Sequence, residues 1–403
     1  MLDFLTLPTL TIAQTLGFER KLTAPDSIGQ CGFGQSVAIA DNIALIGAPG
    51  DEHQGFGSGA AYLIDMSNGE RVHKLTAPQG QPFDYFGWSV AIAGQYALVG
   101  APGDPTSDRG GAAYLFDIQS GRLRHQFTAS ESVNWDGFGL SVAISGDYAL
   151  IGAPGAQNSG GQAYLFDTQT GELRCTFTPA NCTSSHFGWS VAMTENLALV
   201  GAPRTNDTGE SGIADLFELP SGTHLHSLTV PNQGQRNYFG CSVALKGNSV
   251  LIGAAGDFRQ RDRPGCAYLF EALSGKLLRQ LTAPTPTDWD AFGYAVAIDR
   301  HHALVGAYGT SDRSSTAYLF DLNDGVLVQK LTAPEGATLN FFNGSVAVAE
   351  DFALIAASHQ GIGSAYLFKA RPEDGVDTAQ TMPSFASLFG SFLLSGLGLA
   401  EPV

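Results

Sequence analysis

A motif that recurs about every fifty residues constrains the fold of this chain more than any other feature. The motif begins with a Phe-Gly pair, and a seventh, altered copy reads Phe342-Asn343. The six intact pairs begin at Phe33, Phe86, Phe138, Phe187, Phe239 and Phe292. A fixed period of this length is typical of repeat architectures, so the fold is predicted from one unit and then multiplied.

Each repeat predicts four strands. The first follows the pattern FGxSVAI, and the second ends at Gly-Ala-Pro, as in residues 44–50. The third reads AYLF, as in 113–116, and the fourth contains KLTAP, as in 74–78. Short β-rich runs bounded by Gly, Pro, Asn and Asp are typical of strands, and no helical period is sustained. Seven such units predict an all-β, seven-bladed β-propeller with four-stranded antiparallel blades.

The two ends of the repeat region predict how the ring closes. The fourth-strand pattern also occurs once before the first Phe-Gly pair, at 20–25, whereas the seventh repeat ends after its third strand at Phe368. We therefore expect the N-terminal strand to complete the last blade, which leaves no half-blade with an unpaired edge. The expected organisation is an N-terminal extension (1–17), the propeller (18–370), and a linker with a short amphipathic segment (371–403).

The first strand of each repeat is suited to the centre of a ring. In FGxSVA the small residues Gly, Ser and Ala alternate with bulkier ones. One face of this strand is therefore nearly smooth, and backbones of adjacent blades can approach closely near the axis.

The FGxSVA and Gly-Ala-Pro elements, repeated seven times, resemble the FG-GAP repeat. This repeat builds the N-terminal propeller of integrin α subunits and occurs in many bacterial proteins. Integrin-type repeats usually carry a DxDxDG calcium loop between their first two strands. Here those connections are tight, as in 39–45 and 92–98, and none offers three alternating oxygen ligands. The chain therefore resembles a bacterial, metal-free subgroup, and we expect neither a metal nor a cofactor.

Charge narrows the range of partners. The formal net charge is −17 and the isoelectric point is about 4.8. Nucleic-acid binding is not expected, because phosphates attract clustered Lys and Arg. No stretch has the apolar length of a transmembrane helix, and the N-terminus lacks the basic region of a secretory signal. We expect an acidic cytoplasmic protein, compatible with a monomer, while export by another route stays open.

The five cysteines do not predict a disulfide framework. Their number is odd and their spacing is irregular. Free thiols are favoured, although a local disulfide between Cys175 and Cys182 stays open.

The two faces of the predicted ring differ in loop length. One face, the hairpin face, carries the short first-to-second and third-to-fourth connections. The other, the long-loop face, carries the longer second-to-third and fourth-to-first connections. Loops held on a rigid scaffold carry function more often than other segments. We therefore predict the binding site on the long-loop face, over the central channel.

Candidate ligand-binding residues on the long-loop face are aromatic, acidic or arginine side chains near the Phe-Gly pairs. They are Tyr85, Arg109, Trp135, Asp136, Tyr238, Trp289, Asp290 and Arg313. Aromatic rings and guanidinium groups suit a planar or anionic ligand. The alternative is architectural: the aromatic residues cap blade junctions and the arginines form solvated ion pairs. Trp88, Trp189 and Tyr294, which follow a Phe-Gly pair, are expected near the channel, and Asp215 replaces the tyrosine of AYLF.

Two classes of function follow. Repetition without a catalytic signature favours a scaffold that binds a protein partner or a small ligand on the long-loop face. The second class is an enzyme at the same face, because the repeats also resemble the propeller of cyanobacterial resorcinol-alkylating cyclases. In that case Asp136 or Asp290 would be the base, and Arg109 or Arg313 would bind the anion.

Overall fold

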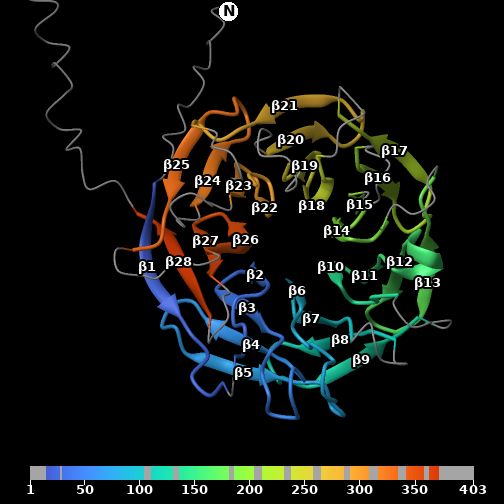
Figure 1. Ribbon diagram of the computed structural model, residues 1–403, viewed down its shortest axis with the longest axis vertical. Helices are drawn as coiled ribbons and strands as arrows, with labels where there is room; N and C mark the ends of the chain where they lie inside the picture. The colour runs from blue at the N-terminus through green and yellow to red at the C-terminus, as the bar shows by residue number, and fades with distance from the viewer. Residues whose placement is uncertain are drawn as a thin grey trace, which may run out of the picture.

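Seven four-stranded antiparallel sheets surround a central axis in the computed structural model (Figure 1). This arrangement confirms the seven-bladed β-propeller; blades are numbered here in chain order. The residues that the structure describes are 15–27, 30–103, 110–129, 136–180, 186–203, 211–230, 237–256, 265–285, 291–307, 316–334, 342–357 and 363–371.

Strand position is the same in every blade. The innermost strands are β2 (Val37–Ala40), β6 (Ser89–Ala93), β10 (Ser141–Ser145), β14 (Ser190–Met193), β18 (Phe239–Lys246), β22 (Val296–Ile298) and β26 (Phe342–Ala349). The second strands are β3 (Ile43–Ala48), β7 (Tyr96–Ala101), β11 (Tyr148–Ala153), β15 (Leu197–Ala202), β19 (Ser249–Ala254), β23 (His302–Ala307) and β27 (Phe352–Ala357).

The third strands are β4 (Ala60–Asp65), β8 (Ala112–Asp117), β12 (Gln162–Asp167), β16 (Ile213–Glu218), β20 (Cys266–Glu271), β24 (Thr316–Asp321) and β28 (Ser364–Ala370). The outer strands are β5 (Arg71–Leu75), β9 (Leu123–Phe127), β13 (Leu173–Phe177), β17 (His224–Leu228), β21 (Leu277–Leu281), β25 (Leu327–Leu331) and β1 (Leu16–Leu22). A one-turn helix, α1 (Ala156–Ser159), lies between β11 and β12.

The N-terminal strand closes the ring as predicted. Strand β1, blue in Figure 1, pairs antiparallel with the red β28, from Leu16 opposite Ala370 to Leu22 opposite Ala365. Blade 7 therefore contains both ends of the repeat region. Strand β1 begins at Leu16, two residues before the expected boundary of the propeller.

The outer strands end earlier than the KLTAP pattern indicated. Strand β5 covers Arg71–Leu75, so Thr76, Ala77 and Pro78 follow the strand. Proline has no N–H for a strand ladder, and it stands where the chain leaves the outer edge for the next blade. The KLTAP pattern therefore marks the end of the outer strand, with Ala77 still buried at 1 % exposure.

In blades 1 to 6 the Phe-Gly pair forms the tight turn that leads into the inner strand. In blade 2 the N–H of Trp88 donates to the carbonyl of Tyr85 at 3.0 Å, and Gly87 has a φ of +90°. A type II turn requires such a positive φ at its third position. A Cβ on Gly87 would also stand 2.2 Å from the carbonyl oxygen of Ala60 in blade 1. Glycine is needed here for both conformation and close packing.

The serine of FGxSVA joins adjacent blades near the axis. Its hydroxyl donates to the carbonyl of the glycine in the next Phe-Gly pair. Four junctions share this bond: Ser36 to Gly87 (2.9 Å), Ser89 to Gly139 (2.7 Å), Ser141 to Gly188 (2.8 Å) and Ser190 to Gly240 (2.8 Å). The close approach of the inner strands, expected from their small residues, is thus accompanied by a directional bond.

The outer strands make a second set of contacts between blades. The central side chains of β5, β9, β17 and β21 reach the third-to-fourth turn of the next blade. The histidine contacts are His73 Nε2 to Gln119 O (3.0 Å), His125 Nε2 to Gln169 O (3.2 Å) and His226 Nε2 to Leu273 O (3.0 Å). Arg20 and Arg279 donate to turn carbonyls in the same way. Gln329 bonds both the N–H and the carbonyl of Leu16.

Cysteine chemistry and membrane crossing can be stated for the described part of the chain. Cys175, Cys241 and Cys266 are free thiols, so the local disulfide left open for Cys175 is not formed, and Cys182 lies outside the described residues. No helix among the described segments is both long and apolar enough to cross a membrane.

Candidate functional site

Four aromatic side chains form a continuous strip on the long-loop face between blades 1 and 2. Phe56 is 61 % exposed, Phe83 is 37 % exposed and Trp88 is 36 % exposed. Ring centroids are 5.3 Å apart for Phe56 and Phe83, 6.3 Å for Phe83 and Tyr85, and 6.0 Å for Tyr85 and Trp88. These are normal aromatic contact distances. We call Phe56, Phe83, Tyr85 and Trp88 the aromatic strip.

Backbone hydrogen bonds hold the aromatic strip in place. The N–H of Phe83 donates to the carbonyl of Phe56 at 2.9 Å, and the N–H of Tyr85 donates to that of Gly57 at 2.9 Å. Two loops that are distant in sequence are therefore fixed against each other. The strip is a preformed surface, and a ligand that contacts it does not need to order it first.

Two residues of the strip have a strained backbone. Phe83 has a φ of 65° and Tyr85 a φ of 53°. A positive φ costs a residue with a side chain about 1–2 kcal/mol. Gly32 and Gly137, which carry no such cost, occupy the position of Tyr85 in blades 1 and 3. The same conformation recurs at this position in blades 4, 5 and 6, at His186 (54°), Tyr238 (53°) and Ala291 (39°), so at Tyr85 it belongs to the repeat. Phe83 remains an outlier of the kind that concentrates at functional sites.

Further aromatic residues lie at the same face around the ring. Trp189 is 40 % exposed and Tyr294 is 45 % exposed, and each comes directly after a Phe-Gly pair. Their expected place near the channel stays a prediction. His186 contacts Trp189 with ring centroids 6.2 Å apart, which repeats the pairing of Tyr85 and Trp88. Burial lowers the pKa of His186, so this imidazole is favoured in its neutral form.

The predicted candidates divide into two groups. Arg109, Trp135, Trp289, Asp290 and Arg313 lie outside the residues that the structure describes. Tyr85 belongs to the aromatic strip. Tyr238 has a φ of 53° at the corresponding position of blade 5. Tyr85 and Tyr238 therefore share a backbone geometry.

Asp136 lies at the same turn of blade 3 and is 3 % exposed. Its backbone carbonyl accepts the N–H of Gly155 at 2.9 Å. The carbonyl of Cys31 accepts the N–H of Gly50 at the same distance in blade 1. The backbone of Asp136 therefore has an architectural role, and a role as base for its side chain stays a prediction.

Sequence reasoning missed Phe56 and Phe83 as site residues. Phe56-Gly57 is a Phe-Gly pair out of phase with the repeat, and Phe83 precedes Tyr85 by two residues. The sequence signal that could have identified them is an aromatic residue outside the repeating pattern. The propeller architecture does not require such a residue.

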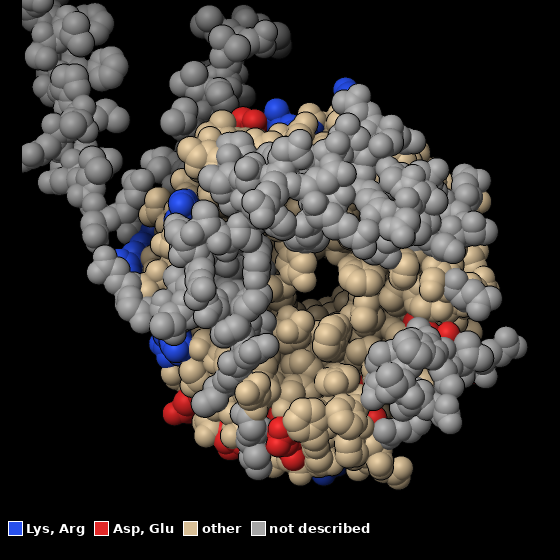
Figure 2. Space-filling view, viewed as in Figure 1, with Lys and Arg blue, Asp and Glu red and all other residues tan. Residues whose placement is uncertain are grey.

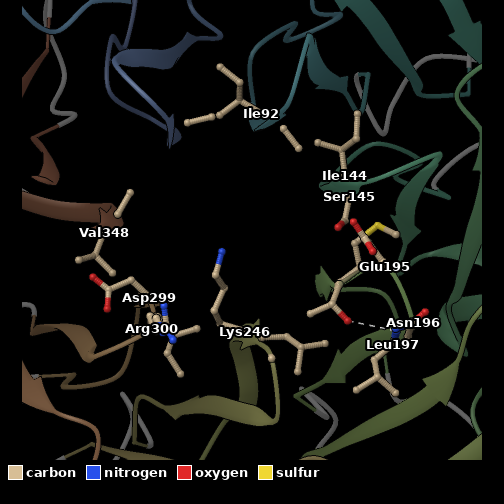
Figure 3. Close-up of a pocket in the computed structure, with 18 of the residues that line it drawn as sticks. Ile92, Ile144, Ser145, Glu195, Asn196, Leu197, Lys246, Asp299, Arg300 and Val348 are labelled. Carbon is tan, nitrogen blue, oxygen red and sulfur yellow. Dashed lines mark hydrogen bonds between the residues drawn. The ribbon is translucent and has the colours of Figure 1, made fainter. Parts of the chain in front are cut away.

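The hairpin face contains a cavity of about 1230 Å³ at the end of the central channel. One aliphatic side chain from the end of each inner strand lines it (Figure 3): Ile39, Ile92, Ile144, Met193, Leu245, Ile298 and Val348. The rim is charged, and Figure 3 shows Lys246 extending into the opening. This cavity lies on the hairpin face, whereas the binding site was predicted on the long-loop face. The prediction therefore stays open.

Asp299 on the rim of this cavity is 5 % exposed. Its burial acts to raise its pKa, but hydrogen bonds from the His302 ring and from the N–H groups of His301 and His302 outweigh burial and lower the pKa. The negative charge of Asp299 is therefore stabilised by groups of its own hairpin. Viewed along the axis, the opening passes through the ring, and the described atoms that border it there belong to residues other than Lys, Arg, Asp and Glu (Figure 2).

Comparisons with known proteins agree with this architecture. A family model described as FG-GAP repeat matches residues 16–64, 70–116, 123–166, 182–217, 224–270, 278–320 and 326–368. No curated protein matches the sequence. Among solved structures, a crystal structure of the WD40 repeats of RRP9 is similar at 10 % identity and a TM-score of 0.59, over 89 % of this chain and 100 % of that chain. At that identity the similarity shows the fold alone.

Proposed function

This chain belongs to the FG-GAP repeat family, and from that premise we propose that it is a binding scaffold whose long-loop face captures a partner through the aromatic strip. The observation that carries the proposal is the strip itself: four contacting rings, of which Phe56, Phe83 and Trp88 are exposed. Exposed clusters of large apolar side chains mark interaction sites on soluble proteins.

The exposure of Phe56 argues against a purely architectural role for the strip. A residue that only caps a blade junction would be buried, as Phe86 is at 0 % exposure, whereas Phe56 is 61 % exposed. Large aromatic side chains contribute much binding energy at interfaces because they lose little conformational entropy on binding. The occupant is expected to be an apolar or planar group, either a side chain of a protein partner or part of a small ligand.

No contact among the described residues favours the enzymatic alternative. Asp136 is the candidate base that the structure describes, and its carbonyl has the turn contact seen in blade 1. Binding without reaction is therefore the function that we propose.

Substitutions at the two ends of the aromatic strip test the proposal. Phe56→Ser and Trp88→Ala are combined, and the variant and the wild-type protein are each purified gently from the native host for native mass spectrometry. We expect a partner or small molecule on the wild-type protein, and a loss of at least about tenfold in its occupancy on the variant, since hot-spot aromatic residues carry 2 kcal/mol or more. The mass of the occupant distinguishes a protein from a small ligand.

A matched control is Leu273→Ser on the hairpin face, where the side chain is 71 % exposed. This variant is expected to keep the occupant, and both variants are expected to keep the melting temperature of the wild type. A wild-type protein without any occupant, or equal occupancy in all three proteins, would refute the proposal.

A further inference from the structure

Blade 4 departs from the repeat at three positions of its two outer strands. Across the other blades, the third strand carries a tyrosine opposite Lys, Gln or Thr of the outer strand, as in Tyr62 opposite Lys74. In blade 4 this pair is Asp215 opposite Ser227. The first residue of the outer strand is Leu in blades 2, 3, 5 and 6, whereas in blade 4 it is His224.

The three departures converge in space. Ser227 Oγ donates to Asp215 Oδ1 at 2.6 Å. His224 Nε2 lies 3.1 Å from Ser227 Oγ and 3.4 Å from Asp215 Oδ1. Three changes at separate positions of a repeat, which meet as Asp, His and Ser, indicate a local role that the other blades do not have.

A β-bulge brings these side chains to one face. His224 and Ser227 are three residues apart, so a regular strand would place them on opposite faces. The pairing of β16 with β17 shifts register between Leu216 and Phe217, and the extra residue of the outer strand restores a common face. The other blades contain the same bulge, so the bulge is a feature of the repeat and does not depend on Asp215, His224 or Ser227.

The charge balance at Asp215 calls for a cation. Asp215 is 0 % exposed, and its Oδ2 has no hydrogen-bond partner among the described residues. The buried carboxylate of Asp51 in blade 1 has Lys74 Nζ at 3.1 Å. Asp215 has no such lysine or arginine, and within the described chain its one ion-pair contact is with His224. A buried carboxylate needs a positive charge beside it.

We propose that Asp215, His224 and Ser227 bind a divalent transition-metal cation, such as Zn²⁺ or Co²⁺, on the outer edge of blade 4. Imidazole nitrogen and carboxylate oxygen suit this class of metal. With metal–ligand bonds of about 2.1 Å, ligand atoms stand about 3.0–3.4 Å apart. The distances from His224 Nε2 to Ser227 Oγ and to Asp215 Oδ1, 3.1 and 3.4 Å, fall in this range. The 2.6 Å between Ser227 Oγ and Asp215 Oδ1 is a hydrogen bond, which the ion would replace as the two oxygens move apart. The His224 side chain is 35 % exposed, so the ion can enter from solvent. Water molecules would complete its coordination.

The sequence did not predict this site because no calcium loop and no close pair of cysteines encodes it. Its residues lie on two strands, and two of them are strong metal ligands, while the hydroxyl of Ser227 is a weak one. The expected affinity is accordingly below that of a structural zinc site with four strong ligands.

Cobalt titration tests the site. The full-length protein is treated with a chelator, dialysed, and titrated with Co²⁺ while visible absorption and melting temperature are followed. We expect one equivalent to bind, with ligand-field absorption and a melting temperature that rises with free Co²⁺. His224→Leu, which restores the residue of four other blades, is expected to fold and to lose affinity by more than about tenfold.

His226→Gln is the matched control, because it removes an imidazole two residues away in the same strand. It is expected to bind Co²⁺ as the wild type does. The proposal is overturned if the wild-type protein binds no Co²⁺ under these conditions, or if His224→Leu binds it as tightly as His226→Gln does. Asp215→Tyr, a second repeat-restoring variant, must likewise lose the cobalt absorption.

Discussion

Comparison of the blades identifies Glu350 as a residue with a strained backbone. The first residue of five inner hairpins has a positive φ: Asp41 (50°), Gly94 (53°), Gly146 (56°), Gly247 (56°) and Glu350 (42°). The two-residue turns that match the twist of strands require this conformation, and glycine adopts it most readily. Glu350 is exposed, so its side chain has little packing to offset the strain.

Glu350→Gly is therefore expected to stabilise the protein by about 1 kcal/mol, although glycine usually destabilises. Chemical denaturation measures the change in the free energy of unfolding. Glu350→Ala serves as the control: it removes the charge but keeps a Cβ at positive φ, so we expect no gain. Equal effects of the two substitutions would show that charge, rather than backbone strain, sets the stability at this hairpin.

The junction between blades 3 and 4 differs from its neighbours in the central residue of its outer strand. Between blades 3 and 4 the central residue of β13 is Cys175, where neighbouring blades carry a histidine that bonds a turn carbonyl. Burial raises the pKa of the Cys175 thiol, which favours the neutral form, a weak donor. This junction lacks the polar contact that His125 makes with Gln169 at 3.2 Å.

Cys175→His should supply the missing contact. Gly222 lies beside Cys175 as Gly171 lies beside His125, so the turn of blade 4 offers the same space. A hydrogen bond to the turn carbonyl of Pro220 is expected to stabilise the ring by about 1 kcal/mol. Thermal melting compares this variant with Cys175→Ala. A melting temperature for Cys175→His at or below that of Cys175→Ala would contradict the prediction.

Closure is the property of the whole molecule that most depends on a single strand. Strand β1 completes blade 7, and Leu16 also bonds Gln329 of blade 6 through both its N–H and its carbonyl. In an open array of repeats the terminal units lack one neighbour, whereas here every blade has two. Loss of β1 would expose the edge of β28 and open this contact at once.

Deletion of residues 1–25 is therefore expected to lower the melting temperature of the whole ring in one cooperative step. Deletion of residues 1–14 keeps all of β1 and serves as the control, with no change expected. Calorimetry follows both proteins. If the longer deletion melted like the shorter one, the strand would not close the ring energetically, whatever its pairing.

The number of blades, the order of the strands and the strand that closes the ring could all be predicted from the amino-acid sequence. These properties follow from local signals: a period of about fifty residues, glycines that adopt positive φ, and one outer-strand pattern that precedes its repeat. Turn conformation depends on the residues of the turn itself, so Gly87 could be interpreted without its neighbours. The outer strand ends only three residues, Thr-Ala-Pro, before the predicted end of the KLTAP pattern.

Which side chains contact one another could not be predicted without the folded structure. Tyr85 was predicted as a site residue, but its contacts with Phe83 and Trp88, and the place of Phe56, depend on hydrogen bonds between two loops. Asp215 stood out in the sequence as a missing tyrosine. Its partner Ser227 lies directly opposite it, but His224 shares their face only because a bulge shifts the register of β17. Contacts of this kind join residues far apart in the chain, and no local pattern encodes them.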